Sequence, residues 1–277
     1  MTSPALQDIV ALLGCPAAGN PAQYLFERAI EAAGLDVRFV TVEVAAARLA
    51  EALGGSAAMG FKGCLLSGPL REAAVPLVGT LTPTASFVGG ITLVERQADS
   101  LVGHMTDGRG VVEALRGHID PAGSRTLVLG AGARGRAVAL ELALAGAAGI
   151  VVADPDQARA ASLAEALGGL SAATATVLEW QSTLGVPPDV DIVVAAGPDA
   201  GGSPTPSIAG LRPDVVVADL TLATTPSAVG RQAAEASACL VDGLEIHAAR
   251  TAIDFQTLLG VETDTELLRD ALDEFLS

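Results

Sequence analysis

Hydrophobic and polar positions alternate along the chain in a way that predicts a mixed α/β protein. Short apolar runs bounded by Gly, Pro or polar residues predict buried strands, and the longer Ala- and Leu-rich stretches between them predict helices. In the first half, strands are predicted over 9–13, 37–44, 63–67, 91–95 and 100–104, and helices over 22–33, 45–53, 70–78 and 108–116. This alternation is typical of a layered α/β fold.

The second half continues the alternation after a linker. The stretch GHIDPAGS, which contains Pro121 and Gly123, predicts a hinge between two domains that meet near 117–125. Beyond it, strands are predicted over 126–129, 150–153, 174–178, 191–195, 215–220 and 239–241, and helices over 136–145, 157–167, 227–237, 244–259 and 265–275.

The loop after the 126–129 strand carries the dinucleotide fingerprint G-x-G-x-x-G, read here as Gly130, Ala131, Gly132, Ala133, Arg134 and Gly135. Gly130 permits a tight turn, Gly132 removes a Cβ that would block a pyrophosphate, and Gly135 lets the helix and strand pack closely. Phosphates are then expected at the N-terminus of the following helix, where unpaired N–H groups meet the positive end of its dipole. We expect Arg134, inside the loop, to contact the pyrophosphate.

An acid in the expected place follows the fingerprint. Asp154 ends the 150–153 strand, where a carboxylate can accept hydrogen bonds from both ribose hydroxyls and repel a 2′-phosphate, so we expect NAD rather than NADP. The alternative is an exposed acid that caps the next helix at Pro155. Because ligands bind beyond the carboxyl ends of parallel strands, the 197–206 loop is expected to border the nicotinamide. Three more cofactor candidates lie near such ends: Gly197, Leu220 and Gly243.

Composition narrows the class of partner. The chain has 277 residues, a formal net charge of −16 and one lysine, Lys62, which argues against nucleic acid or an anionic membrane surface as a partner. No apolar run is long enough to span a membrane, and the start of the chain lacks a basic segment typical of a signal peptide. Three scattered cysteines predict neither a disulfide framework nor a metal site, so we expect a cytoplasmic protein.

The order of the motifs resembles the shikimate and quinate dehydrogenase family across nearly the whole chain. The segments that carry the resemblance are Gly14-Cys15-Pro16, GFKGCLLSGPLRE at 60–72, LVGHMTDGRG at 101–110, the fingerprint, Asp219 at a strand end, and DGLEIHAARTAIDFQTLLG at 242–260. The resemblance implies an N-terminal α/β substrate-binding domain over 1–117, onto which the helices of 244–277 pack back. It also implies a C-terminal Rossmann domain over 118–243 and an oxidoreductase that works in the cleft between the two.

The residues of the implied active site match the family unevenly. Asp107 matches the aspartate of the family's N-T-D motif, which orients substrate beside a catalytic lysine. Arg71 stands where that lysine belongs, and a guanidinium that stays protonated can clamp a carboxylate but is a poor base. Asp107 is therefore the expected proton acceptor, and His104 is a second candidate base.

The other implied substrate positions are mostly less polar than in the family. They are Asn20, Leu65, Ser67, Ile91, Met105, Thr106 and Arg250. Because a site that has lost hydrogen-bonding side chains discriminates against a triol, we expect a cyclic hydroxy acid that is shikimate-like or less polar, and not shikimate itself as the preferred substrate. His118, in the linker, is expected to be solvated.

Three functions stay open on the sequence. The first is an NAD-dependent dehydrogenase that acts on a small-molecule substrate as a monomer or homodimer. The second is a family member that lacks the catalytic base and acts as a nucleotide-sensing or partner-binding protein. The third, a folate- or pterin-linked methylene dehydrogenase, shares the two-domain layout but not the lysine-centred active-site pattern.

Overall fold

The computed structural model describes residues 7–98, 100–170, 172–197 and 206–277. The chain divides into two compact units. Unit 1 comprises residues 1–106 and 251–277, and unit 2 comprises residues 107–250. The second unit thus begins at Asp107 and ends at Arg250, where the sequence predicted 118 and 243 as its limits.

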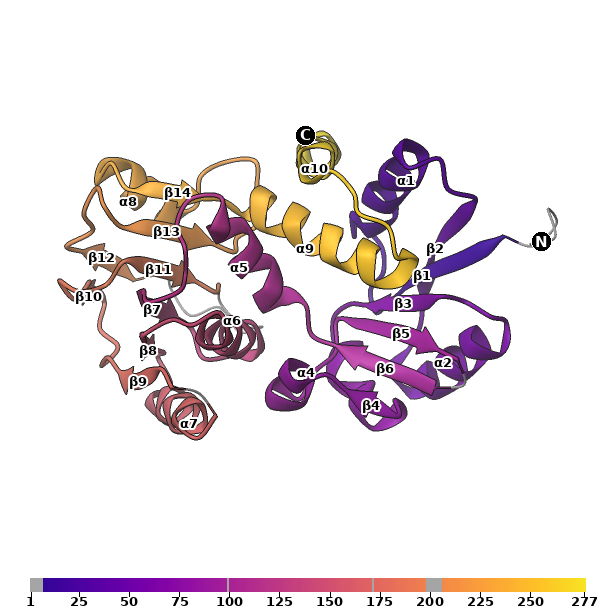
Figure 1. Cartoon of the computed structure of the whole chain (residues 1–277), viewed down its shortest axis with the longest axis horizontal. Helices are drawn as coiled ribbons and strands as arrows, with labels where there is room; N and C mark the ends of the chain where they lie inside the picture. The colour runs from indigo at the N-terminus through magenta and orange to yellow at the C-terminus, as the bar shows by residue number, and fades with distance from the viewer. Residues whose placement is uncertain (1–6, 99, 171, 198–205) are drawn as a thin grey trace. The chain divides into compact units, whose positions relative to one another are not determined.

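Unit 1 is built on a mixed sheet of six strands in the order β2-β1-β3-β5-β6-β4 (Figure 1). β1, β2 and β3 run parallel, whereas β5 is antiparallel to β3 and β6. The strands are β1 (Asp8–Gly14), β2 (Val37–Glu43), β3 (Gly63–Leu66), β4 (Thr80–Leu81), β5 (Leu93–Gln97) and β6 (Ser100–His104). The helices are α1 (Ala22–Ala32), η1 (Ala46–Arg48), α2 (Leu49–Ala58), α3 (Leu70–Ala73), η2 (Val75–Leu77), α4 (Pro83–Val88) and α10 (Thr265–Leu276).

An aliphatic core covers one face of this sheet. Cys64 and Leu66 of β3 pack there with Leu49 and Leu53 of α2, while Leu65 between them belongs to the other face, because side chains alternate along a strand. The helix predicted over 70–78 is interrupted after Ala73, since Pro76 cannot donate a backbone hydrogen bond to continue it.

Unit 2 is a Rossmann domain. The six strands of its main sheet are all parallel and lie in the order β14-β13-β11-β7-β8-β9, which places the strand of the fingerprint at the centre (Figure 1). The strands are β7 (Arg125–Leu129), β8 (Gly149–Ala153), β9 (Thr174–Val177), β11 (Ile192–Ala195), β13 (Val216–Asp219) and β14 (Cys239–Val241). A separate parallel pair joins β10 (Thr183–Gly185) to β12 (Ser207–Ala209).

The helices of unit 2 include α5 (Asp107–Arg116), α6 (Ala133–Leu144), α7 (Gln157–Gly168) and α8 (Ala228–Glu235). A further helix, α9 (Gly243–Leu259), begins in unit 2 and ends in unit 1. α5 belongs to unit 2 because it packs closely on α6: a Cβ on Gly108 would lie 2.3 Å from the carbonyl oxygen of Ala137. The fold class and the Rossmann half agree with the sequence prediction.

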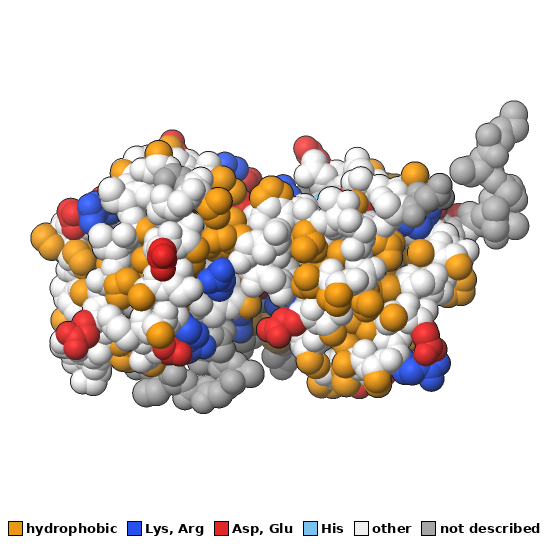
Figure 2. All heavy atoms as spheres, turned by 90° about the horizontal axis from the view of Figure 1, so that it is seen from below, with side chains coloured by type: hydrophobic (Ala, Val, Ile, Leu, Met, Phe, Trp, Pro, Cys, Tyr) orange, Lys and Arg blue, Asp and Glu red, His pale blue; other side chains and the backbone are white. Residues whose placement is uncertain are grey.

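No helix in the described part of the chain is long and apolar enough to cross a membrane. Acidic side chains are scattered singly over the face drawn in Figure 2, which agrees with the interspersed acids of the sequence. Single solvated charges of this kind contribute little to folding stability.

Candidate functional site

The carboxyl ends of the strands of unit 2 form what we call the nucleotide edge: the residues that follow β7, β8, β11, β13 and β14. Gly130 follows β7 with φ +106°, a backbone conformation that favours glycine, and so makes the tight turn that the fingerprint predicted. Gly135 packs against Gly130: a Cβ on Gly135 would come 1.8 Å from the carbonyl oxygen of Gly130. The strand, turn and helix context of the fingerprint is therefore present.

The start of α6 fits the pyrophosphate of a dinucleotide. Gly132 is the N-cap residue in an extended conformation, and no side chain caps the N–H groups of the first turn, which begins at Ala133. Such N–H groups bind anions well. Arg134 lies in the same turn, and its Nη1 would lie 3.7 Å from a Cβ on Gly197, the residue two positions after β11.

Two further predicted cofactor residues also lie along this edge. Leu220 follows β13, is buried, and donates its backbone N–H to Ala195 of β11. Gly243 packs against the loop beyond β13: a Cβ on Gly243 would come 2.0 Å from the carbonyl oxygen of Thr221. Asp219, at the end of β13, accepts hydrogen bonds from the N–H of Thr221 and the hydroxyl of Ser227. Of the loop predicted to border the nicotinamide, residues 198–205 lie outside the described residues.

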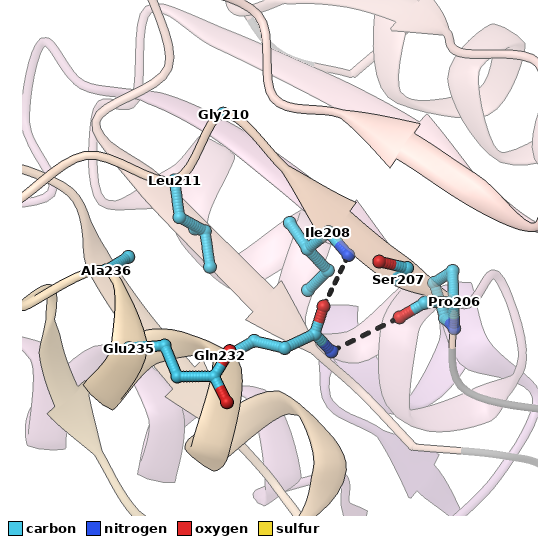
Figure 3. A pocket seen from close by; sticks show the side chains of 8 residues that line it. All are labelled: Pro206, Ser207, Ile208, Gly210, Leu211, Gln232, Glu235 and Ala236. Carbon is cyan, nitrogen blue, oxygen red and sulfur yellow. Dashed lines mark hydrogen bonds between the residues drawn. The ribbon is translucent and has the colours of Figure 1, made fainter.

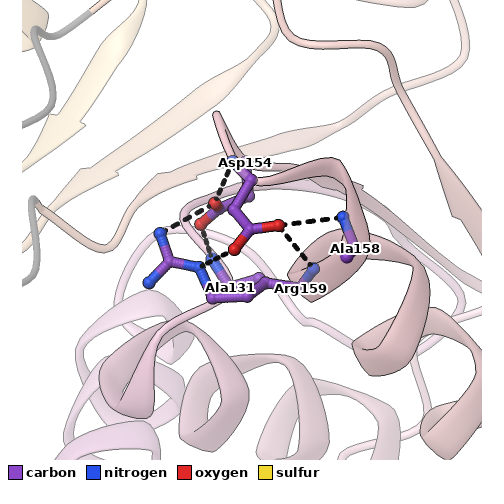
Figure 4. A network of polar contacts seen from close by, with 5 residues as sticks. Ala131, Asp154, Ala158 and Arg159 are labelled. Carbon is purple, nitrogen blue, oxygen red and sulfur yellow. Dashed lines mark hydrogen bonds and ion pairs between the residues drawn. The ribbon is translucent and has the colours of Figure 1, made fainter.

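Asp154 does not present an open carboxylate (Figure 4). It is buried, with one oxygen 2.7 Å from the backbone nitrogen of Ala131 and the other 2.8 Å from that of Asp156 and 3.0 Å from Nη2 of Arg159. The alternative, an exposed helix cap, does not describe it either. That role belongs to Asp156, which accepts from the N–H groups of Ala158 and Arg159 at the start of α7.

A second polar arrangement of unit 2 brings together two residues far apart in the sequence. Asp107 is the first residue of α5 and accepts a hydrogen bond of 3.0 Å from Nη1 of Arg250 on α9. Their side chains are 7% and 18% exposed, so the pair is an ion pair largely withdrawn from water. Gly110 allows it, because a Cβ there would lie 2.6 Å from Cβ of Arg250.

In unit 1, the carboxyl ends of β1, β3 and β6 and the start of β5 form what we call the substrate edge. Ser67 follows β3, with its hydroxyl 3.4 Å from the carbonyl oxygen of Pro16. Arg71 lies on α3, and its Nε donates to the carbonyl oxygen of Leu66 at 3.2 Å. Asn20 accepts a hydrogen bond from the backbone of Ala22 and so caps the start of α1.

The apolar residues predicted at this edge are core residues in the structure. Leu65, Ile91 and Met105 are 4%, 0% and 3% exposed. Ile91 packs in the aliphatic core, and Met105 packs over Gly90. The geometry of Ile91 therefore does not support a direct substrate contact.

A buried hydrogen-bond network lies at the same edge. Thr106 donates to Oδ1 of Asp254 at 2.7 Å, and its hydroxyl is 3.0 Å from that of Thr92. Thr106 and Asp254 are each 1% exposed, and Thr92 is 2% exposed. The sequence analysis missed Thr92 and Asp254; a carboxylate among the apolar residues of a predicted helix was the available signal. The other candidate base, His104, lies 3.0 Å from a carboxylate oxygen of Glu95 on the neighbouring strand.

A pocket of ≈ 580 Å³ lies elsewhere in unit 2, between β12 and α8 (Figure 3). One of its polar side chains, Gln232, is already engaged: its amide accepts from the N–H of Ile208 at 2.6 Å and donates to the carbonyl oxygens of Pro206 and Ala228. The carboxamide completes the free edge of β12, so it stabilises the strand and offers little to a ligand.

Comparison with known proteins gives relatives that match part or nearly all of the chain. The chain is 32% identical over 270 residues to a protein of Citrifermentans bemidjiense named shikimate dehydrogenase (NADP(+)), covering 94% of this chain and 92% of that protein. A protein of the same name from Geobacter metallireducens is 36% identical over 168 residues, but this match covers only 60% of this chain and 59% of the relative. No protein-family model matches the chain.

Among solved structures, the ligand-free 5-ketofructose reductase of Gluconobacter sp. strain CHM43 has the same fold. It superposes with a TM-score of 0.92 and 29% identity, over 98% of this chain and 99% of that one.

The expected preference for NAD, based on Asp154, is wrong. The curated relatives carry NADP(+) in their names. The physical reason is that both oxygens of Asp154 are engaged within the protein, and the guanidinium of Arg159 stands beside them. An acid that is already paired with an arginine repels a phosphate far less than an open carboxylate.

The family follows from the relative of Citrifermentans bemidjiense, which the chain matches along almost its full length, and the two-unit fold agrees with it. The chain belongs to the shikimate dehydrogenase family.

Proposed function

We propose that the chain is an NADP(H)-dependent oxidoreductase that interconverts a secondary alcohol and a ketone on a small hydroxylated substrate. The observation that carries the proposal is the withdrawn ion pair between Asp107 and Arg250, 3.0 Å apart, in the unit that also bears the nucleotide edge. Ionisable groups held in such an environment are typical of catalytic sites.

Asp107 is the proton acceptor in this proposal. An ionised carboxylate only accepts hydrogen bonds, so it takes the hydroxyl proton as the alcohol is oxidised and returns it when the ketone is reduced. Arg250 fixes the position of the carboxylate by donating to Oδ1. Arg71 cannot serve as the base, because a guanidinium stays protonated, and we assign it to orienting a substrate oxygen. When bound, the nicotinamide accepts or supplies the hydride.

The cofactor assignment rests on the surroundings of Arg159. Its side chain is 45% exposed and lies within 4 Å of the carboxylates of Asp154 and Asp156. A guanidinium suits the bidentate recognition of a phosphate, so we propose that Arg159 contacts the 2′-phosphate of NADP.

Two substrate classes have support. A shikimate-like cyclic hydroxy acid, or a less polar one, is supported by the family and by Arg71, whose guanidinium can hold a carboxylate. A small ketose is supported by the similarity to 5-ketofructose reductase.

Steady-state assays with both cofactors discriminate between these classes. NADP⁺ reduction is followed with shikimate and quinate, and NADPH oxidation with 5-ketofructose. In the active pair, Asp107→Asn is expected to lower kcat about 10²- to 10³-fold, the typical contribution of a positioned acid or base, while the Kd for NADPH is unchanged. Glu113→Gln, an exposed acid on the same helix, is the matched control and leaves kcat unchanged.

Two results would count against the proposal. Full activity in Asp107→Asn would remove the assigned proton acceptor. NADPH binding without turnover on any of these substrates would favour the non-catalytic, nucleotide-sensing alternative.

A further inference from the structure

Unit 2 holds a second cluster of reactive side chains, outside the nucleotide edge. His118 follows α5, Cys239 opens β14, and Glu245 lies in the first turn of α9. Nε2 of His118 is 2.8 Å from Oε1 of Glu245, and its Nδ1 is 3.5 Å from Sγ of Cys239. Cys239 pairs with Val216 at the amino end of the parallel sheet, whereas the nucleotide edge is at the carboxyl end.

The contacts fix the tautomer of the imidazole. A carboxylate can only accept a hydrogen bond, so Nε2 of His118 carries the hydrogen that points at Glu245. In the neutral ring Nδ1 is then bare and accepts from the Cys239 thiol. Thiol, imidazole and carboxylate therefore stand in the order of a nucleophile, its base and the group that orients the base.

A metal site does not explain the cluster. The thiol and the carboxylate approach opposite nitrogens of one imidazole and do not converge on a point. The described residues contain no group of three or more His, Cys, Asp or Glu side chains suited to hold a metal ion.

The setting of Cys239 differs from that of a structural cysteine. Cys64 is buried beside Ser56, and burial raises the pKa of its thiol to about 11, which keeps it neutral and unreactive. Cys239 is exposed and has an imidazole in contact. A disulfide in solution can therefore reach the sulfur of Cys239.

We propose that Cys239 is a histidine-assisted thiol that exchanges with small-molecule disulfides. Nδ1 of His118 takes the proton of the thiol as Sγ attacks one sulfur of the disulfide. A new S–S bond forms to Cys239, the original S–S bond breaks, and the leaving thiolate keeps its electron pair and receives the proton from the imidazolium. Cys239 is oxidised, half of the disulfide is reduced to a thiol, and no other oxidant takes part.

The test is the reaction rate of the folded protein with an aromatic disulfide, 5,5′-dithiobis(2-nitrobenzoate), whose leaving thiolate absorbs light. One fast-reacting thiol per chain is expected, and Cys239→Ser removes it. His118→Gln slows it about tenfold at pH 7, and Glu245→Gln slows it less, since general bases contribute at least this much when well positioned. The difference shrinks near pH 9, where free thiols are largely ionised without a base.

Two controls separate a base from a structural role. A variant that loosens the fold exposes Cys64 and adds a second reacting thiol to the count. Independently of any variant, the fast thiol of the wild type is compared with N-acetylcysteine at pH 6.5, and a rate at least threefold higher is expected. Mass spectrometry after incubation with oxidised glutathione is expected to show the mixed disulfide on Cys239.

A wild-type rate equal to that of N-acetylcysteine would overturn the proposal. So would an unchanged rate in His118→Gln at pH 7, or a fast phase that survives in Cys239→Ser.

Discussion

The nucleotide edge of unit 2 and the substrate edge of unit 1 both lie where strands end, but the backbone shapes the first and side chains shape the second. The nucleotide edge is shaped by backbone: Gly130 turns the chain at φ +106°, and Gly135 and Gly243 lie so close to carbonyl oxygens that no Cβ fits. The substrate edge is shaped by side chains, among them Arg71, Ser67 and Thr106.

This difference explains why the glycine motif of the nucleotide edge matches the family pattern more closely than the side chains of the substrate edge do. A position that excludes every Cβ tolerates one residue type, so the glycines keep their motif and their spacing. A side chain can be exchanged without moving the backbone, as the resemblance to the family implies for Arg71 in place of a lysine. Cofactor chemistry can thus stay constant within this fold while substrate chemistry varies.

The largest expected effect tests the backbone-built edge. Gly135→Ala places a Cβ 1.8 Å from the carbonyl oxygen of Gly130, which forces α6 away from β7. Because a steric conflict between backbones cannot be relieved by a rotamer change, we expect a loss of about 4 kcal/mol in the free energy of unfolding or more, together with loss of NADPH binding. Chemical denaturation and fluorescence titration with NADPH measure the two effects.

Gly168→Ala is the control for this variant. Gly168 ends α7, and no atom lies within 4 Å of the point that a Cβ there would occupy, so alanine is expected to be neutral or to stabilise by up to about 1 kcal/mol. Equal stability of the two variants would show that the close approach at Gly135 is not required.

The side-chain-built edge is tested by Thr106→Val. The substitution keeps the shape but removes the hydroxyl that donates to the buried carboxylate of Asp254, so a cost of about 2 to 3 kcal/mol in unfolding free energy is expected. Thr257→Val removes a hydroxyl that bonds only within α9, to Ile253, and should cost less than about 0.5 kcal/mol. Similar urea midpoints for both variants would argue that the network at the substrate edge is not a stabilising one.

The smallest expected effect concerns Arg159. In our proposal this side chain sets cofactor specificity at an edge that is otherwise shaped by backbone. Arg159→Gln is expected to lower kcat/KM for NADP about tenfold while that for NAD changes little, because one charge-assisted contact to the 2′-phosphate is lost. Arg48→Gln, which breaks an exposed ion pair with Glu51 in unit 1, leaves both values unchanged. A parallel decrease for both cofactors would reassign Arg159 to holding Asp154 in place.

Much of the fold could be predicted from the sequence because its signals are local. The buried strands of unit 2 are continuous apolar runs, and the structure has β7, β8, β11 and β13 within one or two residues of the predicted limits. Four short elements, β4, α4, β10 and β12, were missed. Each spans six residues or fewer, which is too short for a hydrophobic period to develop.

The candidate site was less predictable because its pairings are long-range. Arg250 reaches Asp107 across 143 positions, and Asp254 reaches Thr106 across 148. Asp154 was correctly placed at a strand end, but only the three-dimensional structure gives its contact with Arg159. The NADP(+) relatives, and not this contact, overturned the cofactor prediction. His118 was predicted to be solvated for the same reason: its partners, Cys239 and Glu245, lie more than 120 positions away.

Helix α9 bears on how this protein can be taken apart and recombined. Its backbone runs without interruption from Gly243 to Leu259, yet residues up to Arg250 belong to one unit and those from Thr251 to the other. A gene fragment that ends at 250 would cut a helix in its middle and leave its last carbonyl groups without their hydrogen-bond donors. Chimaeras between family members should therefore exchange α9 whole. Their junctions should lie outside this helix and not at the boundary between the two units.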